Sequence, residues 1–164
     1  MRVLDDAMIR QKITRLAYQI VEQNLGEDPL YLLGINNNGK RFADLLQNEL
    51  TKTNSIKVIP GRIQLNPAAP QENPVEIDIP IDKLNGKSVL IIDDVANTGR
   101  TLFYAFSALM EGLPGKVQVG VLVDRKHKNF PVKVDYVGLS LATTLKDNIE
   151  VDLESPEGLS VYLR

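Results

Sequence analysis

The sequence predicts an α/β protein with a mainly parallel, twisted sheet flanked by helices. Short apolar runs typical of buried strands alternate with longer segments in which apolar residues recur every three to four positions, as on one face of a helix. Right-handed crossovers between parallel strands then place helices on both faces of the sheet. One domain over residues 1–164 is the simplest division of a chain of this length.

The N-terminal half begins with a helix whose apolar stripe includes Ile9, Ile13 and Leu16, and whose start is marked by Asp5 and Asp6. The next apolar run is short enough to be a buried strand, and three consecutive asparagines follow it in a predicted turn. The predicted elements are a helix at 5–24, a strand at 30–35, a turn at 34–39, a helix at 40–50 and a strand at 56–65.

The C-terminal half opens with a segment, residues 66–80, that contains four prolines. Such a segment is either a mobile flap, centred on 66–74, or an edge hairpin. The predicted elements after it are a turn at 85–86, strands at 88–93, 117–124 and 134–139, a helix at 98–112 and a final antiparallel strand pair at 149–153 and 159–163.

The composition excludes several classes of protein. Hydrophobic residues make up 43% and charged residues 24%, and the net charge of −2 does not itself indicate a nucleic-acid partner. The absence of cysteine excludes disulfides and thiolate metal sites, and His127 alone cannot form a two-histidine site. No apolar run reaches the ~20 residues of a membrane span, and the N-terminus has no signal-peptide core, so a cytoplasmic location is expected.

The most informative motif covers residues 89–101, where four branched apolar residues lead into Asp93 and Asp94 and then into a glycine-containing loop and a helical pattern. Ligands bind at the carboxyl edge of such sheets, and helix N-termini attract phosphate. Carboxylates suit hydroxyls or a divalent cation instead, so the motif predicts a ribose phosphate ligand. The simpler alternative is a polar strand end in which Asp94 or Thr98 caps the helix.

This motif resembles the 5-phosphoribosyl-1-pyrophosphate (PRPP) signature of type I phosphoribosyltransferases. The resemblance implies their fold with a small flap or hood, and a Mg²⁺ ion carried by PRPP without direct protein ligands. It implies that Asp93 and Asp94 are the catalytic carboxylates, which hold the ribose hydroxyls. The residues that it assigns to the 5′-phosphate are Val95, Ala96, Asn97, Thr98, Gly99, Arg100 and Thr101.

A second resemblance, to the PyrR family, rests on residues 121–127, on Phe130-Pro131 and on residues 135–138. That family comprises pyrimidine-operon attenuators with uracil phosphoribosyltransferase activity. The resemblance implies PRPP and a pyrimidine base or nucleoside monophosphate as ligands, RNA as a further partner, and a homodimer or higher homo-oligomer. The base pocket that it implies consists of Asp124, Arg125, Tyr136 and Val137.

The chain departs from these families at the flap, where residues 63–70 contain no tyrosine or arginine. It departs also at the pyrophosphate turn, whose usual arginine and small hydroxyl residue are replaced. Here the turn is Asn36, Asn37, Asn38 and Gly39, which an ordinary asparagine-rich turn would also explain. Asparagine tolerates left-handed backbone angles, so the geometry of the turn can be kept without its charge.

Two further departures disfavour purine substrates. Asn97 stands where purine-using relatives have a carboxylate, and Asp124 stands where they have a lysine. The first hypothesis is therefore transfer of ribose 5-phosphate from PRPP to uracil, giving UMP and pyrophosphate. The alternative is a nucleotide-sensing regulatory protein with weak or no catalysis.

A basic run comprising Arg125, Lys126, His127, Lys128 and Lys133 is open to three interpretations: a solvated loop, an anion contact at the site rim, or an RNA-binding face. A Rossmann-like domain with another ligand is a weaker explanation of the whole chain. Neither the dinucleotide-binding nor the Walker-type glycine motif occurs in it.

Overall fold

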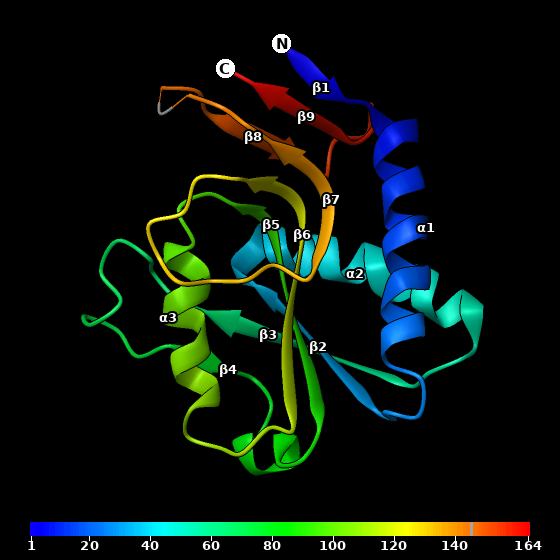
Figure 1. The fold of residues 1–164 in the computed structure, drawn as a ribbon, viewed down its shortest axis with the longest axis vertical. Helices are drawn as coiled ribbons and strands as arrows, with labels where there is room; N and C mark the ends of the chain where they lie inside the picture. Colours follow the sequence, from blue (N-terminus) through cyan, green and yellow to red (C-terminus); the bar gives the residue numbers. More distant parts are fainter. Residues whose placement is uncertain (145) are drawn as a thin grey trace.

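The computed structural model describes residues 1–144 and 146–164, and within them two sheets and three α-helices (Figure 1). The larger sheet has six strands in the order β4-β3-β2-β5-β6-β7, all parallel except β4. The elements are β1 (Arg2–Leu4), α1 (Asp6–Gln23), β2 (Leu30–Ile35), α2 (Asn36–Thr53), β3 (Val58–Gln64), β4 (Glu76–Ile77), the 3-10 helix η1 (Ile81–Leu84), β5 (Ser88–Ala96), α3 (Arg100–Leu109), β6 (Lys116–Arg125), β7 (Tyr136–Leu141), β8 (Ile149–Asp152) and β9 (Ser160–Leu163).

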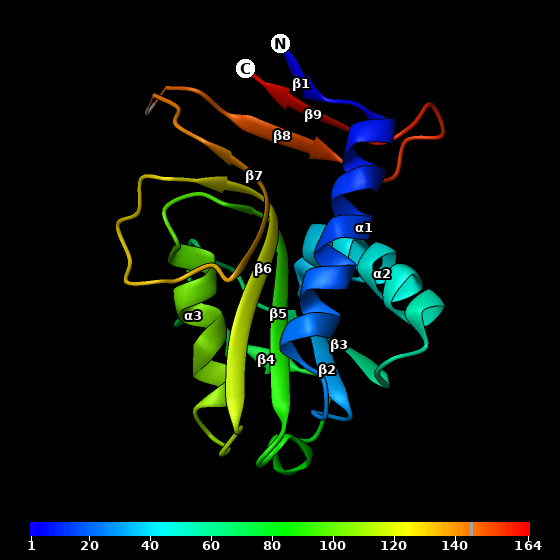
Figure 2. The same ribbon diagram turned by 45° about the vertical axis from the view of Figure 1, so that its right-hand side comes forward.

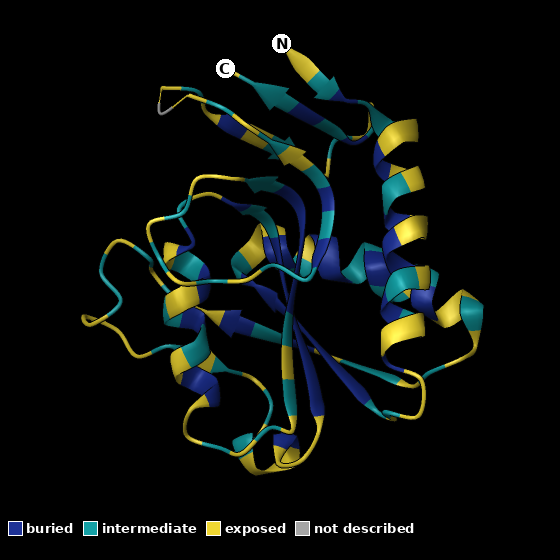
Figure 3. Cartoon of the chain, in the orientation of Figure 1, coloured by how far each residue is buried: buried dark blue, intermediate teal, exposed yellow. Residues whose placement is uncertain are grey.

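The helices cover both faces of the larger sheet, as predicted. Helices α1 and α2 pack on one face, and α3 packs on the other (Figure 2). Side chains alternate along β2 between these two cores: Leu32 belongs to the first, whereas Leu33 belongs to the second. Every residue of β2 is buried because the strand is central and covered on both faces (Figure 3).

Strand β2 is observed at its predicted residues, but helix α2 already begins inside the turn predicted at 34–39. Helix α2 begins directly at Asn36, which has a left-handed φ of 51°. Gly34 and Gly39 permit this close junction, since a Cβ on Gly34 would lie 2.4 Å from the Cα of Lys40 and one on Gly39 would lie 2.7 Å from the carbonyl oxygen of Ile92. The first turn of α2 therefore sits against the end of β5.

The smaller sheet is antiparallel and lies beside the chain termini (Figure 1). It contains the predicted C-terminal pair, β8 and β9. Strand β1, which the sequence analysis did not predict, adds to the edge of β9. Three residues are too few for a recognisable alternation, so this strand depends on its pairing partner.

The proline-rich segment forms an edge hairpin, one of the two predicted alternatives. Strand β4 pairs antiparallel with β3 through Ile63–Ile77 and Gln64–Glu76. Residues 66–74 form turns outside the sheet. Among the described residues, no helix has the length and apolar character needed to cross a membrane.

Candidate functional site

The start of α2 and the loop after β5 meet at the carboxyl edge of the larger sheet because β2 and β5 are adjacent and parallel, with Gly34 beside Ile92. They line a cavity of about 470 Å³ that the first turn of α2 borders on one side and the acid pair borders on the other. The lining residues are Ile35, Asn36, Asn37, Asn38, Asp93, Asp94, Val95, Asn97, Thr101 and Ile149. Gly39 lies beneath this surface, against Ile92 and Asp93.

The three asparagines hold the start of α2 in place through their side chains. The amide of Asn36 both donates to the carbonyl of Leu65 and accepts from its N–H, each at 3.0 Å. Asn38 Nδ2 donates to Asp94 Oδ2 at 3.1 Å. Asn37 Oδ1 accepts from the guanidinium of Arg62 on β3. The asparagines therefore connect α2 to both neighbouring strands, which an ordinary surface turn would not do.

The acid pair is unequally buried. Asp93 is 8% exposed, whereas Asp94 is partly exposed. Burial raises the pKa of the Asp93 carboxyl well above its usual value, and the negative charge of Asp94 raises it further. Within the described part of the chain, no lysine or arginine forms an ion pair with either carboxylate. Neutral donors bond three of the four oxygens, the Asp94 N–H, the Val95 N–H and Asn38 Nδ2, but none of them neutralises the charge, so a ligand's hydroxyls or a cation can still bind the pair.

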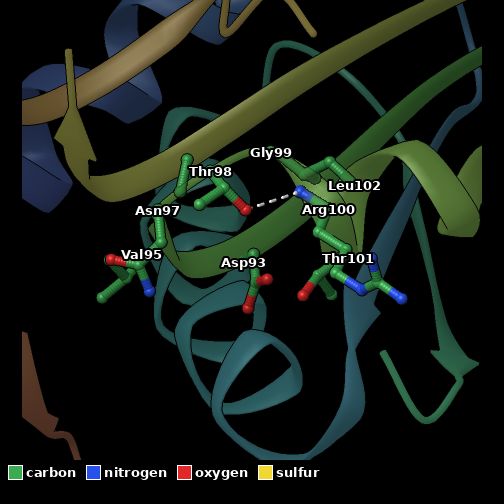
Figure 4. Close-up of a pocket in the computed structure, with 9 residues that line it drawn as sticks. Asp93, Val95, Asn97, Thr98, Gly99, Arg100, Thr101 and Leu102 are labelled. Atoms are coloured by element: carbon green, nitrogen blue, oxygen red, sulfur yellow. Dashed lines mark hydrogen bonds between the residues drawn. The ribbon is translucent and has the colours of Figure 1, made fainter. Parts of the chain in front are cut away.

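The loop after the acid pair encloses a second, smaller cavity of about 40 Å³ at the start of α3 (Figure 4). The residue that precedes the helix is Gly99 in the left-handed region, with a φ of 87° and no side-chain cap. The alternative in which Asp94 or Thr98 caps α3 is therefore wrong. The cavity lining is Asp93, Val95, Ala96, Asn97, Thr98, Gly99, Arg100, Thr101 and Leu102.

This smaller cavity has the properties of an anion site. The first N–H groups of a helix have no intrahelical partner, and the helix dipole favours negative charge there. Thr98 and Thr101 add hydroxyls to the lining, and Thr98 Oγ1 accepts from the Arg100 N–H at 3.4 Å. Figure 4 shows Asp93 between the Asn97 side and the Thr101 side of the loop. All seven residues assigned to the 5′-phosphate line this one cavity.

Arg125 connects the loop after the acid pair to the segment after β7. Its Nη1 donates to Asn97 Oδ1 at 3.3 Å, its Nε donates to Thr143 Oγ1 at 2.7 Å, and its Nη2 donates to the carbonyls of Thr144 and Asp147 at 2.7 and 2.9 Å. The guanidinium therefore holds the segment after β7 beside the acid-pair loop. It also occupies the Asn97 amide oxygen, so the amide nitrogen remains as that side chain's donor.

Asp124 forms an ion pair with Lys128 at 2.6 Å, and both side chains are less than one-fifth exposed. Lys128 Nζ also lies 3.4 Å from the Ala96 carbonyl oxygen. Among the five residues of the basic run, Lys126, His127 and Lys133 are exposed, as expected of a solvated loop. Arg125 and Lys128 are instead part of the site's framework.

The predicted placement of Tyr136 in a base pocket is wrong, whereas that of Val137, which is half-buried, stays a prediction. Tyr136 is 2% exposed, and its hydroxyl donates to Gln118 Oε1 at 2.7 Å and lies 3.2 Å from Asn24 Nδ2, at the end of α1. Strand β7 begins at Tyr136, and Val137 lies beside Val121, which itself pairs with Asp93. Both residues are therefore level with the start of the acid pair but two strands away from it, and neither lines the two cavities.

Ile149, at the start of β8, lines the cavity and was not among the predicted site residues. One signal could have done so. A predicted parallel strand that ends near residue 139 delivers the chain to the carboxyl edge, so the next apolar residue after the loop is a candidate for the cavity wall.

The 66–74 segment lies beside the start of α3. Arg100 Nε donates to the Pro67 carbonyl at 2.7 Å, and its guanidinium lies over the rings of Tyr104 and Phe130, 5.2 and 5.8 Å from their centroids. The cation and aromatic groups that the segment lacks are therefore contributed to its surroundings by α3 and the loop before β7.

Comparisons with known proteins agree with this geometry. The family described as "Phosphoribosyl transferase domain" matches residues 2–156. "Bifunctional protein PyrR" of Bacillus cereus (strain AH820) is 37% identical over 165 residues, covering 94% of this chain and 91% of that protein. "Bifunctional protein PyrR 1" of Lactiplantibacillus plantarum is 35% identical over 166 residues, covering 95% and 92%. The hypoxanthine phosphoribosyltransferase of Trypanosoma cruzi shares the fold, with a TM-score of 0.80, 20% identity, and coverage of 99% and 95%.

Proposed function

We propose that this chain transfers the phosphoribosyl group of PRPP to uracil. The premise is that the chain belongs to the phosphoribosyl transferase domain family and is similar to PyrR proteins over nearly its whole length. One observation carries the proposal: the acid pair and the amide-rich loop line adjoining cavities at the carboxyl edge of the sheet. A diol beside a phosphate matches the two linings in order.

In the proposed reaction, Asp93 and Asp94 accept hydrogen bonds from the ribose hydroxyls, and the loop from Val95 to Thr101 holds the 5′-phosphate. The bond between C1 and the pyrophosphate oxygen breaks, and the bond between C1 and N1 of uracil forms, while the N1 proton is lost to solvent. Positive charge develops on the sugar ring, which the carboxylates stabilise. Positioning of both reactants supplies the rest of the rate enhancement, and no side chain acts as nucleophile.

Mg²⁺ fits this site as an ion carried by the substrate. Among the described residues, no group of three or more His, Cys, Asp or Glu side chains forms a metal cluster, but Asp93 and Asp94 offer the hard carboxylate oxygens that Mg²⁺ accepts together with phosphates. When bound, the ion neutralises charge on the departing pyrophosphate.

The residues expected beside the base, here called the base wall, are Asn97, Asp124 and Ile149, and they favour a pyrimidine. Asn97 cannot serve as a general base, and Asp124 is neutralised by Lys128 rather than presented to a purine carbonyl. Because Arg125 engages Asn97 Oδ1, the amide nitrogen of Asn97 is left to donate to a carbonyl of uracil. Ile149 provides an apolar surface for the ring.

The direct test is an assay of uracil plus PRPP with Mg²⁺, followed by pyrophosphate release, with hypoxanthine and guanine as control bases. We expect pyrophosphate release with uracil and none with hypoxanthine or guanine. No turnover with any base, together with binding of UMP, would favour the alternative, a nucleotide-sensing regulatory protein. The specific observation behind that alternative is the missing cation in the Asn36–Asn38 turn and in the 66–74 segment.

The regulatory alternative predicts a second ligand, RNA, in keeping with the similarity of this chain to PyrR proteins. Filter binding at several salt concentrations tests it, because phosphate contacts must produce a decrease of affinity with salt. The proposed homo-oligomer is tested separately by light scattering of the purified chain.

A further inference from the structure

A third cavity, of about 450 Å³, lies on the other side of Asn37 and Asn38 from the acid pair. These two asparagines line both cavities and so form the wall between them. The rest of its lining is strongly charged: Lys40, Arg41, Asp44, Arg62 and Glu154. A ligand that extends past the Asn36–Asn38 turn would enter this cavity.

The cations of this cavity differ in how they are compensated. Lys40 forms an ion pair with Asp44 at 2.8 Å, and Arg41 Nε donates to the Leu153 carbonyl at 3.0 Å. Arg62 has neither kind of partner: within the described residues it forms no ion pair, and its guanidinium donates only to Asn37 Oδ1.

The Arg62 guanidinium is also partly removed from water. The residue is half-buried, and its Nε is buried without a hydrogen-bond partner. A cation desolvated in this way, with a donor left unpaired, is costly unless an anion completes its surroundings. Arginine is the side chain best suited to a phosphate group, because its planar fork donates two parallel hydrogen bonds.

The position of Arg62 in the sheet brings this cation to the turn. Arg62 pairs with Gly34 in the register of β3 and β2, one residue before β2 ends. Helix α2 begins at Asn36 without a side-chain cap, so its first N–H groups, which belong to the asparagines of the wall, have no intrahelical partner. A phosphate group there would meet backbone donors from α2 and a guanidinium from β3.

We propose that Arg62 supplies from β3 the positive charge that the Asn36–Asn38 turn lacks, and that the cavity between them receives the distal phosphate of a diphosphate ligand. The inference rests on the proposed function, since PRPP is the ligand that carries a diphosphate next to a ribose 5-phosphate. On binding, the guanidinium exchanges Asn37 Oδ1 for phosphate oxygens. Arg62 then binds the leaving group of the transfer.

The test compares Arg62→Gln with wild type by calorimetry in Mg²⁺ buffer, using inorganic pyrophosphate, PRPP and UMP as separate probes. Arg62→Gln is expected to weaken binding of pyrophosphate and PRPP by about 10- to 100-fold, the range for a lost hydrogen bond to a charged group. UMP affinity should change less than about twofold, which also shows that the variant is folded. Arg62→Lys should recover part of the loss, because it keeps the charge and lacks the fork.

Arg15→Gln is the matched control, since Arg15 lies on α1 and donates to the carbonyls of Val137 and Gly138, away from all three cavities. Unchanged pyrophosphate affinity in Arg62→Gln, or a wild type that binds UMP but neither pyrophosphate nor PRPP, would overturn the inference. If uracil is turned over but PRPP affinity does not depend on Arg62, the proposed function is retained and the inference about Arg62 is refuted. If pyrophosphate binding depends on Arg62 but no base is turned over, the inference about Arg62 is retained and the proposed function is refuted.

Discussion

The acid pair should lower the free energy of unfolding of the ligand-free protein, and the substitution Asp93→Asn should raise it again. Asp93 is 8% exposed and unpaired with any cation of the described residues, beside the charge of Asp94. Both side chains line the same cavity, and the charge of Asp94 acts directly on the Asp93 carboxyl. For neighbouring charges at the high effective dielectric constant of a partly exposed site, the repulsion is about 1–2 kcal/mol. Asparagine removes this repulsion and keeps an oxygen to accept from the Asp94 N–H, which Asp93 Oδ1 now does at 2.9 Å.

The expected result is a rise of about 1–2 kcal/mol in the free energy of unfolding at pH 7, equivalent to roughly 2–8 °C in Tm for a chain of this size. The pKa of Asp93 is raised in the folded state, so the unfolded chain releases this proton first as pH rises. The cost is therefore absent below the unfolded-state pKa, grows as pH rises from that value to the folded-state pKa, and is constant above it. Wild type and Asp93→Asn should consequently converge in strongly acidic buffer.

Thermal unfolding followed by circular dichroism between pH 3 and 8, with and without PRPP, measures both effects. Asp82→Asn, on an exposed residue, controls for the change in net charge. PRPP should stabilise the wild type more than Asp93→Asn, because the carboxylate binds the ligand. A lower Tm of ligand-free Asp93→Asn at pH 7 would refute the reasoning, since it would mean that the charge is satisfied within the folded protein.

Three further predictions concern the neighbours of the acid pair. Asp94→Asn should weaken PRPP binding by roughly 1–3 kcal/mol in calorimetry, as expected for a lost charge-assisted hydrogen bond, and unchanged affinity would remove this carboxylate from the site. Gly39→Ala should lower Tm and ligand affinity together, because its Cβ would lie 2.7 Å from the Ile92 carbonyl oxygen; a Tm equal to that of wild type would show that α2 can move away from β5. Arg100→Ala should accelerate limited proteolysis within residues 66–74, because it removes the hydrogen bond to the Pro67 carbonyl, and an unchanged cleavage rate would show that other contacts hold the segment.

The parts of the fold that were predictable are those encoded locally. Strand β2 was located to the residue because a fully buried strand is apolar at every position, and Asn36 ends that run. Strand β5 was predicted to stop at Asp93, since a carboxylate is typical of a strand end. It continues to Ala96 because β6 pairs with it as far as Ala96–Asp124, which is information from a distant segment.

The base wall shows the same limit more clearly. Tyr136 and Asp124 are both strand residues near polar neighbours, and nothing local shows which of the two side chains reaches the site. The Tyr136 side chain is buried in the core, with its hydroxyl bonded to Gln118 near the end of α1, whereas Asp124 lies beside Ala96. The acid pair and its loop could be located from the sequence because strand, loop and helix are contiguous there.

Whether the chain catalyses transfer or senses nucleotides depends on where its binding energy is used. PRPP and UMP share the ribose 5-phosphate, so the contacts of Asp93, Asp94 and the loop after them are expected to be similar for both ligands. Binding that is equal in the ground state and the transition state does not raise kcat.

Discrimination between PRPP and UMP must come from the two ends of the site, Arg62 on the diphosphate side and Asn97 on the base side. An enzyme requires that the diphosphate end tighten as the C1–O bond breaks, so Arg62→Gln should lower kcat as well as affinity. In a sensor the same variant should alter PRPP affinity alone and leave the response to UMP intact.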